Sequence, residues 1–169
     1  MDLLNEYVGF VGAGYLEAVD RLKECWFFLS LMKQTTEFDH FRWSTNAFLS
    51  AARAVMDWLA TSAHYAIPCE GQWEMEEDPR AIAILSKHFS MNRTKNGRVF
   101  AESPTNPLLQ RLCDDRNETS HRGPLWIRPE MVDDPGEFRF GWDDVPVVEF
   151  AEDVLRILTN IQREVRPDL

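Results

Sequence analysis

Apolar residues recur every three to four positions in four stretches of the chain, which is the spacing of an amphipathic helix. The predicted helices cover residues 14–33, 36–65, 105–122 and 144–166. Thr36, with Asp39 three residues later, is the predicted N-cap of the second helix. The third helix is predicted to end before Gly123-Pro124, because helices rarely pass such a pair.

The segments between these helices are predicted from shorter patterns. Residues 79–89 show weaker helical spacing, and residues 90–103, of mixed basic and polar character, are predicted to form a loop. Residues 125–128 and 138–142 alternate apolar and polar side chains around the turn-forming run Asp133-Asp134-Pro135-Gly136, which predicts a hairpin. The predicted fold class is all-α, a four-helix up-down bundle with an additional short helix and a small β-hairpin before the last helix.

Composition narrows the class of protein. With 169 residues, 44% of them hydrophobic, residues 1–169 are predicted to form a single domain with its own core. Cys25, Cys69 and Cys113 have no CxxC spacing, so we expect reduced thiols rather than disulfides or a structural zinc site. No apolar run approaches the roughly 20 residues that span a bilayer, and the N-terminus is acidic, so we expect no membrane contact and a cytoplasmic location.

Charge is unevenly distributed along the chain. The net charge is −10, yet the segment from Arg80 to Arg128 holds nine basic and only four acidic residues. Local sign matters more than net charge, because salt screens charges beyond roughly 10 Å. The basic middle third therefore keeps a nucleic-acid partner open, although a DNA partner is not expected.

The third predicted helix carries the candidate chemistry. Its apolar face has a repeat of four through Leu108, Leu109, Leu112 and Cys113. The same register continues through polar pairs, namely Arg116 with Asn117 and Ser120 with His121. If this face stays turned toward protein, a guanidinium, an amide and an imidazole are held in a cleft. The last turn of a helix also favours the protonated form of a histidine.

The Arg116-Asn117-x-x-x-His121 run, together with residues 46–53 on the second helix, resembles the HEPN superfamily of helical domains. That resemblance extends from the second helix to the end of the last. It implies an all-helical bundle and metal-independent RNA cleavage by a homodimer, commonly as the toxin of a toxin–antitoxin pair. One branch of the family has a tyrosine two residues after the histidine, which a partner nucleotidyltransferase modifies. Gly123 stands there in this chain, so neutralisation by that route is not expected.

The resemblance and the chemistry of RNA cleavage together assign roles to residues. His121 is predicted to be the general acid or base, Arg116 the cation for the phosphate, and Asn117 the group that orients either. Further predicted substrate-binding residues are Arg122, Arg111 and Ser120, and predicted structural residues are Asn46 and Arg53. Neither a metal nor another cofactor is predicted, and the expected partners are a second copy of the chain, RNA and an antitoxin protein.

Three other interpretations compete with this one. In the first, Arg116 and His121 are ordinary helix-end residues, with Arg116 paired to Asp144 or Glu149. In the second, the ExxH pairs Glu37/His40 and Glu118/His121 belong to a di-metal carboxylate bundle. In the third, the chain is a non-catalytic HEPN-like dimer that binds a partner protein or a nucleotide.

Within the second helix, Asp57 lies one turn after Arg53 and is its predicted intrahelical partner.

Overall fold

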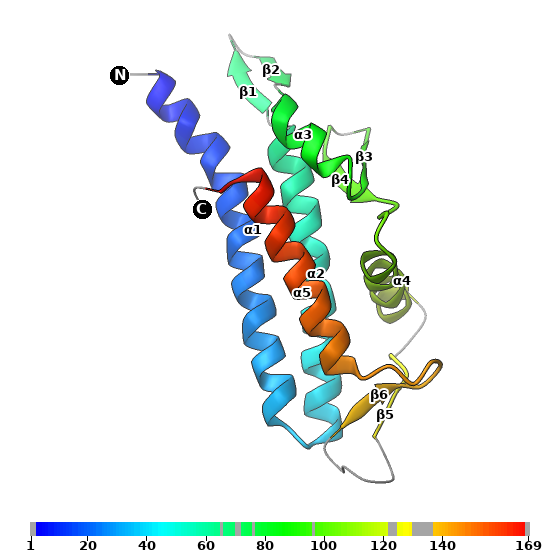
Figure 1. Ribbon diagram of the computed structural model, residues 1–169. Coiled ribbons are helices and arrows are strands. Elements are labelled where there is room, and N and C mark those ends of the chain that lie inside the picture. Colours follow the sequence, from blue (N-terminus) through cyan, green and yellow to red (C-terminus); the bar gives the residue numbers. More distant parts are fainter. Residues whose placement is uncertain are drawn as a thin grey trace.

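The computed structural model describes residues 3–64, 66–69, 72–75, 77–95, 97–121, 125–129 and 137–167, shown in Figure 1. For residues 3–14, 66–69, 72–75, 120 and 121 it describes the backbone alone. The described chain is mostly helical, as the sequence predicts. No helix in these ranges combines the length and the apolar character needed to cross a membrane.

Three long helices form the body of the molecule. These are α1 (Leu3–Gln34), α2 (Phe38–Ala63) and α5 (Val147–Val165), which lie side by side in Figure 1. The apolar stripes of α2 and α5 face one another and α1, and they bury Phe48, Leu49 and Leu158 completely. Burial of such side chains stabilises the fold by about 2 kcal/mol each, which explains why the helical periodicity was a reliable guide here.

The start of α2 differs from its prediction. The helix begins at Phe38 after Glu37, which has extended backbone angles and makes no side-chain cap. The predicted N-cap at Thr36 is wrong, because Thr36 lies two residues before the helix. Thr35 Oγ1 accepts a hydrogen bond from the Glu37 amide (3.2 Å) and so turns the chain between α1 and α2.

Two further helices pack against α2 and α5. Helix α3 (Pro79–Leu85) is capped by Asp78, whose carboxylate accepts from the Ala81 amide at 2.9 Å. Helix α4 (Pro107–His121) begins after Asn106, whose side chain accepts from the Leu108 amide at 2.9 Å. Figure 1 shows α4 nearly along its own axis, while the long helices run lengthwise. Because α4 runs across its neighbours in this view, the predicted up-down arrangement of four helices is not confirmed.

Short antiparallel strand pairs fill the connections in the described part of the chain. They are β1 (Ala66–Cys69) with β2 (Gln72–Met75), β3 (Ser90–Arg93) with β4 (Val99–Glu102), and β5 (Ile127–Pro129) with β6 (Phe138–Phe140). The β5–β6 pair confirms the predicted hairpin before the last helix. The predicted loop at 90–103 is wrong, because Val99 and Ala101 turn inward and are buried in the core cluster while β3 pairs alongside.

Candidate functional site

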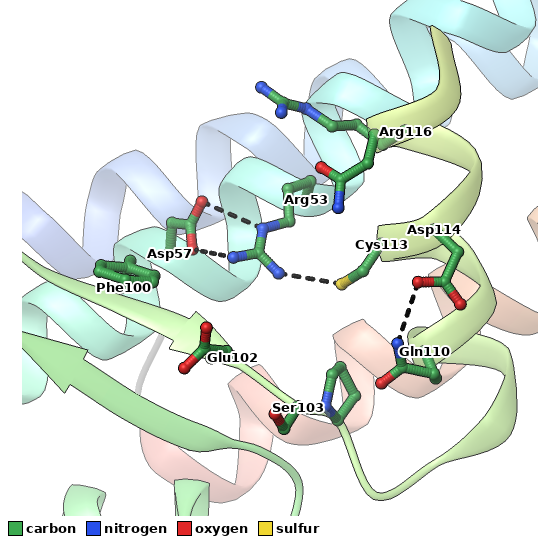
Figure 2. Close-up of a pocket in the computed structure, with 11 residues that line it drawn as sticks. Arg53, Asp57, Phe100, Glu102, Ser103, Gln110, Cys113, Asp114 and Arg116 are labelled. Atoms are coloured by element: carbon green, nitrogen blue, oxygen red, sulfur yellow. Dashed lines mark hydrogen bonds and ion pairs between the residues drawn. The ribbon is translucent and has the colours of Figure 1, made fainter. Parts of the chain in front are cut away.

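A cavity of about 410 Å³ lies between α2, β4 and α4. Helix α2 contributes Arg53 and Asp57, strand β4 contributes Phe100 and Glu102, and α4 contributes five residues, among them Arg116. Figure 2 shows these side chains around the cavity, with Arg53 in its middle and Arg116 at its upper edge. The cavity therefore joins parts of the chain that are about 60 residues apart, and it includes three of the predicted site residues, Arg53, Arg116 and Asn117.

Arg53 forms the back of the cavity and is already fully engaged. Its guanidinium pairs with Asp57, one helical turn away, at 3.1 Å, as expected from their spacing. It also donates to the Cys113 sulfur at 2.9 Å and to the Ala101 carbonyl on β4. One side chain thus connects α2 to both α4 and β4.

Asp57 completes this connection. Its Oδ1 accepts a hydrogen bond from the Ala101 amide at 3.0 Å, and its Oδ2 accepts from Arg53 Nε at 3.3 Å. The Arg53–Asp57 pair therefore binds both the carbonyl and the amide of Ala101. Burial raises the pKa of Asp57, and the neighbouring positive charges of Arg53 and Arg116 oppose that rise. The positive field of Arg116 therefore extends into the cavity as far as this carboxyl.

Arg116 is half-buried and lines the same cavity from α4. Its Nε is buried and has no hydrogen-bond acceptor. Within the described ranges its guanidinium forms no ion pair, which contradicts the predicted pairing with Asp144 or Glu149. Asp144 is instead paired with Arg128 and with Arg139. Arg116 is therefore a cation on the cavity wall that no ion pair within the described ranges neutralises.

The two asparagine residues of the predicted site, Asn117 and Asn46, lie in different surroundings. Asn117 also lines the cavity but is exposed, and Asp115 rather than Asn117 is the polar residue that α4 buries. The predicted continuation of the apolar face therefore holds for Arg116 and fails for Asn117. Asn46 lies two turns before Arg53 on α2, half-buried, and its Oδ1 is buried without a hydrogen-bond partner.

Arg111 does not belong to this cavity, although it was a predicted substrate-binding residue. It forms ion pairs with Asp115 (3.3 Å) and Asp143 (2.6 Å). Its guanidinium also lies over the rings of Phe140 and Phe150, at 4.1 and 5.0 Å from their centroids. These contacts join α4 to the segment that connects β6 with α5.

Asp115, the buried partner of Arg111, has a raised pKa. Asp115 is 5% exposed. Burial raises the pKa of Asp115 to about 6, while the ion pair with Arg111 limits the rise. The carboxyl is therefore ionised at neutral pH largely because Arg111 is beside it, and it gains a proton in mild acid.

The end of the predicted motif lies partly outside the described residues. Helix α4 extends to Ser120 and His121, but their side chains are outside the description, as is the whole of Arg122. The structure thus brings Arg53, Arg116 and Asn117 to one cavity and directs Arg111 elsewhere.

Phe100 and Glu102 are among the cavity residues that reasoning from the sequence missed. Both lie on β4, in the segment predicted to be a loop. The available signal was the alternation in Val99-Phe100-Ala101-Glu102, which points Val99 and Ala101 inward and leaves the other two side chains toward the cavity.

The predicted di-metal alternative has no ligand set among the described side chains. No group of three or more histidine, cysteine, aspartate or glutamate side chains there lies close enough to hold a metal ion. Glu37 and His40 are exposed at the start of α2, and the His40 ring lies 5.5 Å from the Trp43 ring.

Comparison of the chain with protein-family models, with curated proteins and with solved structures gives no match.

Proposed function

We propose that this protein is a metal-independent endoribonuclease of HEPN type, acting as a homodimer in the cytoplasm. The observation that carries the proposal is Arg116, a cation without an acidic partner in the described chain, on the wall of a polar cavity. It lies five residues before the histidine with which α4 ends. The up-down helical bundle and the antitoxin partner that the resemblance implies belong to the same proposal.

The reaction needs three kinds of group. The 2′-hydroxyl attacks the adjacent phosphorus, so a base must accept its proton and an acid must protonate the departing 5′-oxygen. A cation must stabilise the charge that develops on the phosphate oxygens. We assign the proton transfers to His121, the phosphate to Arg116, and the orientation of either to Asn117. One chain has one motif histidine, so a second copy supplies the second.

Arg116 suits this role because of its unmatched charge. A guanidinium binds phosphate oxygens through two parallel hydrogen bonds, and such charge-assisted bonds are about twice as strong as neutral ones. Arg53, in contrast, is held by Asp57, Cys113 and Ala101 and has little capacity left for a ligand. We therefore assign Arg53 to positioning the wall of the site rather than to the phosphate.

The test is cleavage of a labelled single-stranded RNA by the purified full-length chain in the presence of EDTA. We expect cleavage by the wild type and a loss of at least 100-fold in His121→Ala, the magnitude typical of a general acid or base. His40→Ala is the matched control, since His40 is exposed at the start of α2, and it should cleave normally. Equal activity of wild type and His121→Ala, with no other nuclease present, would exclude the proposed chemistry.

A second candidate function is a non-catalytic module that binds a partner protein. Exposed aromatic residues favour it, because Trp26 and Phe27 on α1 and Trp43 on α2 are each more than half exposed. A well-folded dimer that cleaves no RNA would favour this candidate over the ribonuclease.

A further inference from the structure

The cavity beside Arg116 has two chemically different sides. Figure 2 shows Arg116 on one side and Glu102 on the opposite side, with Arg53 between them. The guanidinium of Arg53 is already bound to Asp57, Cys113 and Ala101. Two other carboxylates line the cavity, but Asp57 is paired with Arg53 and Asp114 accepts from the Gln110 amide. A ligand that fills the cavity therefore meets Arg116 at one end and Glu102 at the other, which favours a molecule with an anionic end and a donor-rich end.

The size and the walls of the cavity fit a nucleotide. Its volume of about 410 Å³ lies near the lower end of the range for small-molecule sites, roughly 300–1,000 Å³. Phe100 is half-buried on the cavity wall and offers a ring against which a base can stack. Single-stranded RNA is commonly recognised in this way, by stacking on an aromatic ring and by hydrogen bonds to the edge of the base.

The carboxylate of Glu102 restricts which base can bind. An ionised carboxylate only accepts hydrogen bonds, and it has about four lone-pair sites. Glu102 is exposed, and one of its oxygens accepts from the Asn92 amide, which leaves capacity for a ligand. Guanine presents two neighbouring donors, N1–H and the 2-amino group, which match a carboxylate. Uracil presents one N–H between two carbonyl oxygens, and a carboxylate repels those oxygens.

We infer that this cavity binds the guanine base of a nucleotide, with Phe100 against the ring, Glu102 on N1–H and the 2-amino group, and Arg116 on the adjacent phosphate. The inference rests on the proposed function for the identity of the polymer, an RNA chain. It adds a substrate preference, cleavage next to guanosine, that the proposed function does not contain. Free guanosine monophosphate shares the same chemistry, so the two sources are separated by experiment.

The first arm measures binding of free nucleotides to the full-length chain by calorimetry. We expect guanosine 5′-monophosphate to bind at least about tenfold more tightly than uridine 5′-monophosphate, the discrimination typical of a two-bond contact to a base. Inosine 5′-monophosphate, which lacks the 2-amino group, should fall between them. Glu102→Gln should remove the preference, whereas Glu17→Gln, an exposed carboxyl on α1, should keep it. Equal binding of the guanosine and uridine nucleotides to the wild type would overturn the inference.

The second arm measures cleavage of a polyuridine oligonucleotide that contains a single guanosine. Cleavage confined to the linkage next to guanosine, and spread along the chain in Glu102→Gln, supports the inference for RNA. Cleavage without base preference overturns the inference and leaves the ribonuclease standing. A guanosine preference in binding without any cleavage supports the guanine site for the free nucleotide and overturns the ribonuclease instead.

Discussion

Arg111 and Arg116 lie five residues apart on the same helix, and both were predicted to contact RNA. Arg111 is paired with two carboxylates and covered by two aromatic rings. Arg116 lines a cavity, and its buried Nε has no acceptor. The same residue type on one helix therefore serves to join elements in one case and remains available to a ligand in the other.

The difference has a local cause that can be recognised in the sequence. Arg111 has Asp115 four residues later, at the spacing that brings two side chains together on a helix. The residues three and four positions from Arg116 in either direction are Leu112, Cys113, Thr119 and Ser120, none of them acidic. An arginine without an acid at helical spacing is thus the better candidate for a ligand contact.

The largest effect is expected on RNA cleavage, in a variant whose stability should barely change. If the proposed function holds, Arg116→Ala should lower RNA cleavage by about 100- to 1,000-fold, the cost of removing a group that stabilises charge in a transition state. Its free energy of unfolding should stay within about 0.5 kcal/mol of wild type, because no ion pair of the described chain is lost. Cleavage assays and urea unfolding measure the two quantities. Full activity in this variant would remove Arg116 from the site.

Arg111→Met should show the reverse pattern. Removing the guanidinium leaves Asp115 buried without its cation, and breaking such a pair costs about 3 kcal/mol or more of unfolding free energy. Urea unfolding at pH 7 measures this loss. Arg156→Met is the matched control, since Arg156 forms an exposed pair with Asp153 and should change stability by less than about 0.5 kcal/mol. Similar stability of the two variants would mean that Arg111 is not a structural residue.

A double variant tests where that loss comes from. If the cost of Arg111→Met arises at the buried Asp115 carboxyl, which without Arg111 is either unpaired or protonated, adding Asp115→Asn should restore up to about 1–2 kcal/mol, because a neutral amide is less costly to bury than a carboxylate. The measurement is the same urea unfolding, compared through a double-mutant cycle with both single variants. A double variant no more stable than Arg111→Met would place the cost in lost packing against Phe140 and Phe150 instead.

The smallest expected effect is a dependence on pH. The pKa of Asp115 is raised to about 6 in the folded chain, from about 3.9 when unfolded. Between these values the folded state binds more protons, so this group stabilises the fold as the pH falls and loses that contribution as the pH rises through 6. Relative to Asp115→Asn, wild type should gain about 1 kcal/mol between pH 7 and pH 5. Thermal or urea unfolding of both proteins at the two pH values checks the sign.

The sequence predicted what depends on local periodicity and missed what depends on distant contacts. The apolar spacing in α2 and α5 identified both helices, since their stripes are long and regular. Strand β4 was missed because its two inward residues, Val99 and Ala101, are too few to establish a pattern and are buried by helices from other parts of the chain. The same limit applied to Arg111, whose contacts with Asp143, Phe140 and Phe150 lie about 30–40 residues away.

The hydrogen bonds that Arg53 and Asp57 form with Ala101 have a consequence for the effect of mutations on the cavity. Both groups of Ala101, its carbonyl and its amide, are bound by a pair of residues on α2, and Glu102 is the next residue along β4. The position of Glu102 therefore depends on a helix residue, Asp57, that lies 44 residues before Ala101 in the sequence. If the proposed guanine site holds, a substitution at Asp57, whose carboxylate contacts only the backbone of the strand, should change the preference for a base while leaving Arg116 in place. Under that proposal, substrate preference and the rate of cleavage depend on different residues.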